Sequence, residues 1–71
     1  MGSYSKTIEA DMIYVYSLMD EKSQRHYAAI EALKLGQGGI HYIAALFGMS
    51  EKTVHRGIEE IKKGQASSQE G

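Results

Sequence analysis

The sequence predicts an all-α fold: a small four-helix domain with a C-terminal helix-turn-helix. Three observations carry this prediction. The 71 residues include no proline, so nothing stiff interrupts a helix. Apolar residues recur at the spacing of one helical face in four separate segments. Glycines and capping residues stand between those segments, where helices are expected to begin and end.

The first helix is expected from Lys6 to Leu18. One apolar stripe, at i, i+4, i+7 and i+11, consists of Ile8, Met12, Val15 and Met19, widened by Ile13 and Tyr16. Residues 1–5 precede it. Met1-Gly2-Ser3 resembles an expression scar, so we expect residues 1–5 to be a tag remnant or disordered.

The second helix is expected from Glu21 to about Leu35. Asp20 is a good N-cap, Glu21 suits the positive end of the helix dipole, and Gly36 is the natural residue after the last turn. Two opposite faces of this helix are apolar, one with Tyr27, Ile30 and Leu33, the other with Ala28, Ala32 and Leu35. Such a helix is usually central, with neighbours on both sides.

Gln37-Gly38-Gly39 is interpreted as a flexible link to a third helix, which begins near Ile40 or His41 and ends at Phe47. Ser50 should cap a fourth helix over residues 51–63, in which Val54, Ile58 and Ile61 share one face. The domain is therefore expected to span residues 6–63. Residues 64–71, rich in Gln, Ser and Gly, are expected to be a disordered tail.

The last two helices have the spacing of a helix-turn-helix. Two short helices that cross steeply need a small residue at their approach, a turn residue that tolerates positive φ, and an apolar anchor. Ala44, Gly48 and Val54 supply these three in order. Gly57 stands where a large aliphatic residue is usual, and we interpret it as a close-approach site against the second or third helix. The second to fourth helices would then form a homeodomain-like trihelical core, with the first helix added at the N-terminus.

The outer face of the fourth helix is predicted to bind double-stranded DNA in the major groove. The N-terminal part of a recognition helix faces base edges, and an arginine such as Arg56 can bind guanine O6 and N7 bidentately. Ser50 and the free amides beside it are candidate phosphate contacts. The predicted DNA-binding residues are Ser50, Lys52, Thr53, His55, Arg56 and Lys63.

Charge is the main observation against DNA binding. The chain has a net charge of −1, whereas a dedicated DNA-binding domain is usually basic. Residues 50–63 nevertheless carry a small positive excess of one. Lys52 and Arg56 could therefore be an ordinary solvated face, and Lys63 could simply pair with Glu59 four residues earlier.

A family resemblance adds to this interpretation. The segments 20–29, 31–33, 48–50, the run Leu35-Gly36-Gln37-Gly38-Gly39-Ile40 and the run Thr53-Val54-His55-Arg56-Gly57-Ile58 resemble the N-terminal region of bacterial insertion-sequence transposases of the Rhodopirellula type. In those proteins such a domain precedes an RNase-H-like catalytic domain with acidic metal ligands. The resemblance implies a transposase-like protein that recognises the terminal DNA of its element through the helix 51–63.

Two alternatives remain open: a protein-interaction or dimerisation module, with two copies meeting through residues 6–19, and a transcriptional-regulator helix-turn-helix with no role in transposition. These 71 residues hold no catalytic domain, so we do not expect this chain to be an enzyme. His26, His41 and His55 lack the spacing of metal ligands, and we expect no metal, cofactor or small-molecule substrate. Without cysteine, a signal peptide or a membrane span, a cytoplasmic location is expected.

Overall fold

The fold is all-α, as predicted. The computed structural model describes the backbone of residues 3–70 and the side chains of residues 3–65. It contains four helices: α1 (Lys6–Ser17), α2 (Glu21–Leu35), α3 (Gly39–Phe47) and α4 (Glu51–Glu70). The first two helices have nearly the predicted bounds. None of the helices in the described part of the chain is both long and apolar enough to cross a bilayer.

Side-chain oxygens cap three of the helices. Asp20 accepts a hydrogen bond from the backbone N–H of Ser23 at 2.8 Å, and Ser50 accepts one from that of Thr53 at 3.1 Å. Both N-caps were predicted. Ser5 does the same for α1, accepting from the N–H of Ile8 at 3.2 Å. Each bond satisfies a donor that the first turn of a helix leaves without an intrahelical partner.

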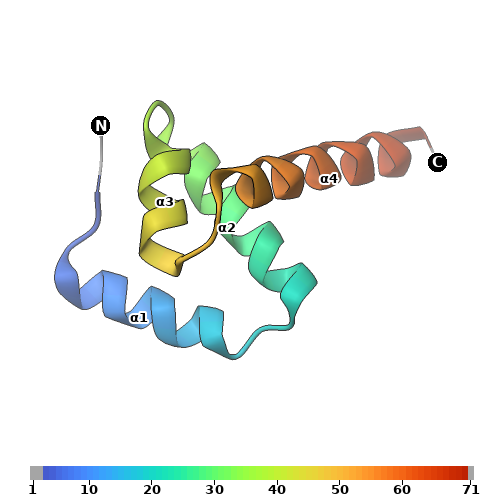
Figure 1. Cartoon of the computed structure of the whole chain (residues 1–71). Coiled ribbons are helices and arrows are strands. Elements are labelled where there is room, and N and C mark those ends of the chain that lie inside the picture. The colour runs from blue at the N-terminus through green and yellow to red at the C-terminus, as the bar shows by residue number, and fades with distance from the viewer. Residues whose placement is uncertain (1–2, 71) are drawn as a thin grey trace.

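Helix α2 is central, as predicted, but only one of its two apolar faces is covered by neighbouring helices. Figure 1 shows α3 and α4 crossing it and α1 running beneath α3. The buried core consists of Met12, Ala28, Ala29, Ala32, Ile43, Ala44, Val54 and Ile58. The face of α2 that packs is therefore the alanine face, because small residues let both neighbouring helices approach its backbone. Ile30 and Leu33, on the opposite face, are exposed.

Two glycines allow this close packing. A Cβ built on Gly57 of α4 would lie 2.5 Å from the carbonyl oxygen of Arg25 and 3.1 Å from Cβ of Ala29, so the close approach predicted at Gly57 is confirmed, and its partner is α2. Gly39 is buried against the backbone of Ala32. The prediction of a flexible link over residues 37–39 is wrong at Gly39, which is the first residue of α3 and packs too closely to be loose.

Helix α1 lies on the core with only part of its apolar stripe. Met12 is its one buried residue, while Ile8 and Val15 of the same stripe are exposed. The ring of Tyr16 stacks on Phe47 of α3, with ring centroids 4.2 Å apart and planes 2° from parallel. Only part of the stripe is buried because α1 contacts α2 and α3 through few residues, and the rest of the stripe stays exposed to solvent.

Both ends of the domain differ from the prediction. Tyr4 does not behave as part of a tag remnant: its hydroxyl donates to Glu31 at 2.9 Å, and its N–H donates to the Tyr42 hydroxyl at 3.1 Å. In place of the expected disordered tail, residues 64–70 continue α4 to Glu70; Gly71 lies outside the described residues. Without proline, no residue in this segment removes a helical hydrogen bond, so the helix of residues 51–63 can propagate.

Candidate nucleic-acid interface

The outer face of α4 gathers most of the predicted site residues. Four of the six, with one carboxylate, line a single shallow hollow: Lys52, Thr53, His55, Arg56 and Glu59. This face is exposed because the opposite face of the same helix carries Val54 and Ile58, both buried. The helical period thus separates a core-facing stripe from a polar outer surface within a few turns.

The two other predicted residues lie apart from this hollow. Ser50 stands at the start of α4, where its Oγ caps the helix and lies 2.9 Å from the Thr53 hydroxyl. Lys63 is exposed and lies eleven residues beyond Lys52, about 16 Å along the axis at 1.5 Å per residue. A ligand that contacts both lysines must therefore be extended along the helix.

Arg56 is exposed but already has a partner. Its side chain is 68% exposed, and its Nε donates to Oε2 of Glu60 at 3.1 Å. The two residues are four apart on α4, the spacing at which helical side chains meet. The guanidinium is therefore held at one of its nitrogen atoms and open to solvent at its outer end.

Glu60 is the centre of a cluster that joins α2 to α4. Arg25 donates to it twice, from Nε at 2.8 Å and from Nη2 at 3.2 Å, and Nε2 of His26 lies 2.9 Å from Oε1. These contacts lower the pKa of Glu60 from 4.5 to about 2, chiefly through the hydrogen bond from Arg25, and further through those of His26 and Arg56. Glu60 is consequently ionised throughout the neutral range, and its carboxylate is fixed from two helices.

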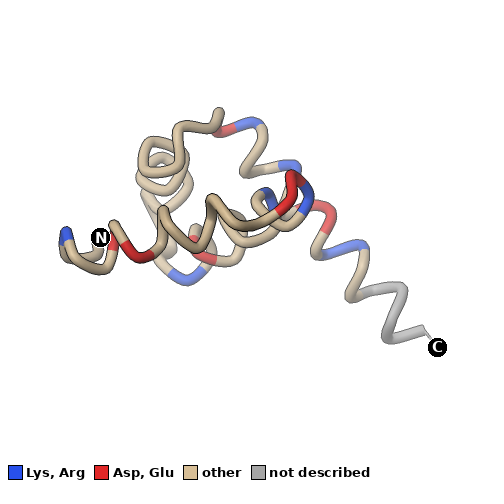
Figure 2. The backbone as a smooth tube through the Cα atoms, turned by 90° about the horizontal axis from the view of Figure 1, so that it is seen from below, with Lys and Arg blue, Asp and Glu red and all other residues tan. Residues whose placement is uncertain are grey.

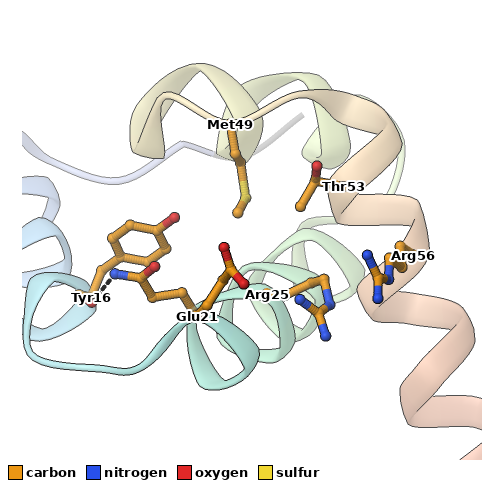
Figure 3. A pocket seen from close by; sticks show the side chains of 7 residues that line it. Tyr16, Glu21, Arg25, Met49, Thr53 and Arg56 are labelled. Carbon is orange, nitrogen blue, oxygen red and sulfur yellow. Dashed lines mark hydrogen bonds between the residues drawn. The ribbon is translucent and has the colours of Figure 1, made fainter.

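A second hollow lies beside this cluster, between the N-terminal end of α2 and the start of α4. Figure 3 shows its lining, with Arg25 and Arg56 at one end and Tyr16 at the other. Gln24, which also lines the hollow, donates to the carbonyl of Tyr16 at 2.9 Å. The carboxylate of Glu21 also projects into this hollow, which makes it a poor site for a free anion.

Acidic and basic positions are interleaved along α4 (Figure 2). Glu51 lies 2.9 Å from Nδ1 of His41, so one of the acidic groups near the start of α4 has a partner on α3. The ion pair suggested between Glu59 and Lys63 does not form among the described residues. Glu59 instead lies within the hollow on the outer face.

Sequence reasoning missed the Glu60 cluster, although part of its signal was visible. Arg56 and Glu60 have the i, i+4 spacing of a helical ion pair. The contacts of Arg25 and His26 depend on how α2 crosses α4, which no local pattern encodes. The three histidines lie on three different helices, and in the described residues no group of three or more acidic, His or Cys side chains could hold a metal ion.

Comparison with models of known protein families, with curated proteins and with solved structures finds no match for this chain. The function must therefore be argued from the geometry of α4 and its surroundings, together with the resemblance in the sequence.

Proposed function

We propose that this chain is a double-stranded DNA-binding domain in which α3 and α4 form a helix-turn-helix and α4 enters the major groove. The observation that carries the proposal is the outer face of α4, where the exposed side chains of Lys52, His55 and Arg56 lie together with the half-buried Thr53. Polar and cationic side chains on the first turns of an exposed helix are the usual means of reading base edges.

The connection between α3 and α4 supports this proposal. Only residues 48–50 separate the two helices, and Gly48 has the positive φ of 68° that ends α3 in a left-handed turn. Ala44 of α3 and Val54 and Ile58 of α4 are buried in the core, as expected for the anchors of a helix-turn-helix. Because the turn is short and the anchor residues are buried, the position of α4 relative to α3 is fixed.

The resemblance to Rhodopirellula-type transposases supports a more specific target, the terminal DNA of an insertion element. A transcriptional regulator with the same fold would also bind through α4. The two cases differ in where the preferred DNA sequence occurs: at both ends of a mobile element, or upstream of genes.

Selection of binding sites from randomised duplexes, followed by anisotropy titration of the selected site, tests the proposal. Arg56→Ala should weaken binding to that site by about 1–3 kcal/mol if the arginine reads a base. Lys6→Ala is the matched control, because Lys6 is a fully exposed cation on α1, away from the outer face of α4. Equal binding by Arg56→Ala and the unchanged protein at moderate salt would contradict the base-reading role.

A second candidate function, association through α1, is favoured by a specific observation. Leu18 is 69% exposed and Tyr14 is 65% exposed, beside Ile8, Ile13 and Val15. Apolar residues gathered on one helix are typical of surfaces that meet another protein. We propose that two copies of this chain form a dimer in which residues 6–19 of one copy pack against residues 6–19 of the other.

Sedimentation velocity tests the association. A Tyr14→Ser/Leu18→Ser variant should lower the sedimentation coefficient if the unchanged protein is a dimer, and this substitution leaves the buried Met12 in place. Deleting residues 1–19 would be a poorer test, because it also removes Met12 and the contacts of Tyr4 and Tyr16 with the core. A strictly monomeric unchanged protein would count against this function.

A further inference from the structure

We propose that Glu60 is a positioning residue that fixes the Arg56 guanidinium for the recognition of one guanine. This inference rests on the proposed DNA-binding function and names the base that the outer face of α4 would read. Glu60 itself would not touch DNA. It would act by holding Arg56 in the orientation needed before DNA arrives.

The geometry leaves the correct edge of Arg56 open. Glu60 accepts from Nε of Arg56 at 3.1 Å. Among the described residues, this is the single hydrogen bond that the Arg56 guanidinium makes, so Nη1 and Nη2 remain available as a pair of donors. Two parallel donors match the O6 and N7 acceptors that guanine presents in the major groove, and no other base presents two acceptors there.

Glu60 can hold Arg56 because it is itself held. Both of its oxygens accept from Arg25 on α2, and His26 contacts Oε1. The Arg25 side chain is only 12% exposed, which makes it a rigid support. Arg25 and Arg56 lie at the same end of the hollow between α2 and α4, as Figure 3 shows.

An unrestrained arginine loses rotamer freedom when it binds a base. Immobilising a long side chain typically costs about 0.5–1.5 kcal/mol, which corresponds to about 2- to 10-fold in affinity. A side chain that is already fixed avoids most of this cost. The benefit applies only where Arg56 meets its guanine, so it affects selectivity more than general affinity for DNA.

The negative charge of Glu60 has an opposite and separate effect, since any carboxylate near DNA repels phosphates. Glu59 provides the matched control. Glu59 carries the same charge, directly precedes Glu60 in α4 and lies on the outer face. It is not among the residues that contact Arg56. Glu59→Gln and Glu60→Gln therefore remove equal charge, but only the second changes the support of Arg56.

The experiment compares two duplexes with each protein. One is the duplex selected by the unchanged protein, and the other has 7-deazaguanine at the position where Arg56→Ala loses its preference, which removes N7 alone. The dissociation constant of the 7-deazaguanine duplex divided by that of the selected duplex measures how strongly the protein recognises this guanine. Because both duplexes are titrated with the same protein sample, a partly unfolded fraction cancels from the ratio.

We expect Glu60→Gln to reduce this ratio about 2- to 10-fold while binding to the 7-deazaguanine duplex stays equal or becomes tighter. Glu59→Gln should tighten both duplexes alike and leave the ratio unchanged. Arg25→Lys, which keeps the charge but not the two-pronged contact with Glu60, should also reduce the ratio. A ratio in both Glu60→Gln and Arg25→Lys equal to that of the unchanged protein would overturn the positioning role.

Failure of the proposed function has a different signature. If the unchanged protein selects no sequence from the randomised duplexes, the DNA-reading function and this inference both fall. If it selects a site and Arg56→Ala loses a guanine preference, the DNA-binding function is supported. The ratio of dissociation constants for Glu60→Gln then tests the role of Glu60 alone.

Discussion

Gly57 of α4 lies directly against the carbonyl group of Arg25 on α2, where a Cβ atom would come within 2.5 Å of the oxygen. We expect Gly57→Ala to destabilise the domain. Overpacking costs about 1–3 kcal/mol, and the better helix propensity of alanine returns about 1 kcal/mol at most. The net loss should be up to about 2 kcal/mol in urea unfolding monitored by circular dichroism. Because the obstacle is backbone, relief requires α4 to move away from α2, which would also pull Glu60 from Arg25.

The same substitution at Gly64 should have the opposite sign. Gly64 is in α4, and a Cβ there would meet nothing within 4 Å. Alanine should then stabilise the helix by about 0.5–1 kcal/mol. This measurement also tests whether residues 64–70 are helical in solution. No change in stability or in helical circular dichroism with Gly64→Ala would favour the disordered tail that the sequence had predicted.

Gly48 makes a third kind of glycine prediction. Its surroundings are open, but its φ of 68° is in the left-handed region. Gly48→Ala should cost about 1–2 kcal/mol from backbone conformation alone. Gly48→Asn should lose less, since asparagine adopts this conformation more readily. Equal losses of stability for the two variants in urea unfolding would contradict this prediction, because they would show that the backbone of the turn leaves the left-handed conformation in both.

The sequence was informative wherever a local rule decides the structure. The caps at Asp20 and Ser50, the left-handed glycine at Gly48 and the buried Val54 all follow from spacing and residue type. The sequence predicts the end of α4 too early, because a glycine at position 64 followed by polar residues is also typical of the end of a helix. A glycine inside a helix costs only about 1 kcal/mol, which neighbouring turns can offset.

The candidate site was predicted only in part, for a related reason. The exposed positions on α4 follow from helical periodicity once Val54 and Ile58 face the core. The connection of Arg56 to α2 through Glu60 and Arg25 depends on the crossing of two helices set by Gly57 and Ala29. Tertiary contacts of this kind carry no signature in residue spacing. For the same reason the choice of the alanine face of α2, rather than that of Ile30 and Leu33, was not foreseen.

The contact between Tyr4 and Glu31 predicts that residues before α1 contribute to stability. Glu31 is 9% exposed, and the Tyr4 hydroxyl donates to its Oε1 at 2.9 Å, while Lys34 lies at 3.5 Å. Tyr4→Phe would deprive a buried acceptor of its closest partner, so we expect a loss of about 1–3 kcal/mol. Tyr14→Phe is the control. Tyr14 is 65% exposed, and its variant should stay within about 0.5 kcal/mol of the unchanged protein. Equal stabilities for the two variants in urea would show that the residues before α1 are not attached.

The lowered pKa of Glu60 predicts a stability that declines in acid. The pKa of this carboxyl is about 2 in the folded protein against an ordinary 4.5, so the unfolded chain takes up the proton first as the pH falls. The contribution of Glu60 is therefore complete above about pH 4.5 and is lost as the pH falls toward about 2. Asp20 adds to the same trend, because the hydrogen bond from the backbone N–H of Ser23 lowers its pKa as well.

Urea unfolding over this acid range separates Glu60 from the other carboxylates. Glu60→Gln cannot titrate, so its midpoint should lie below that of the unchanged protein at neutral pH and approach it as the pH falls toward about 2. Glu59→Gln is the matched control, because it removes a carboxylate that is not part of the cluster with Arg25 and His26. A gap between Glu60→Gln and the unchanged protein that stays constant across the acid range would mean that protonation of Glu60 is not linked to folding. The cluster would then not hold the carboxylate in the ionised form on which the fixed orientation of Arg56 depends.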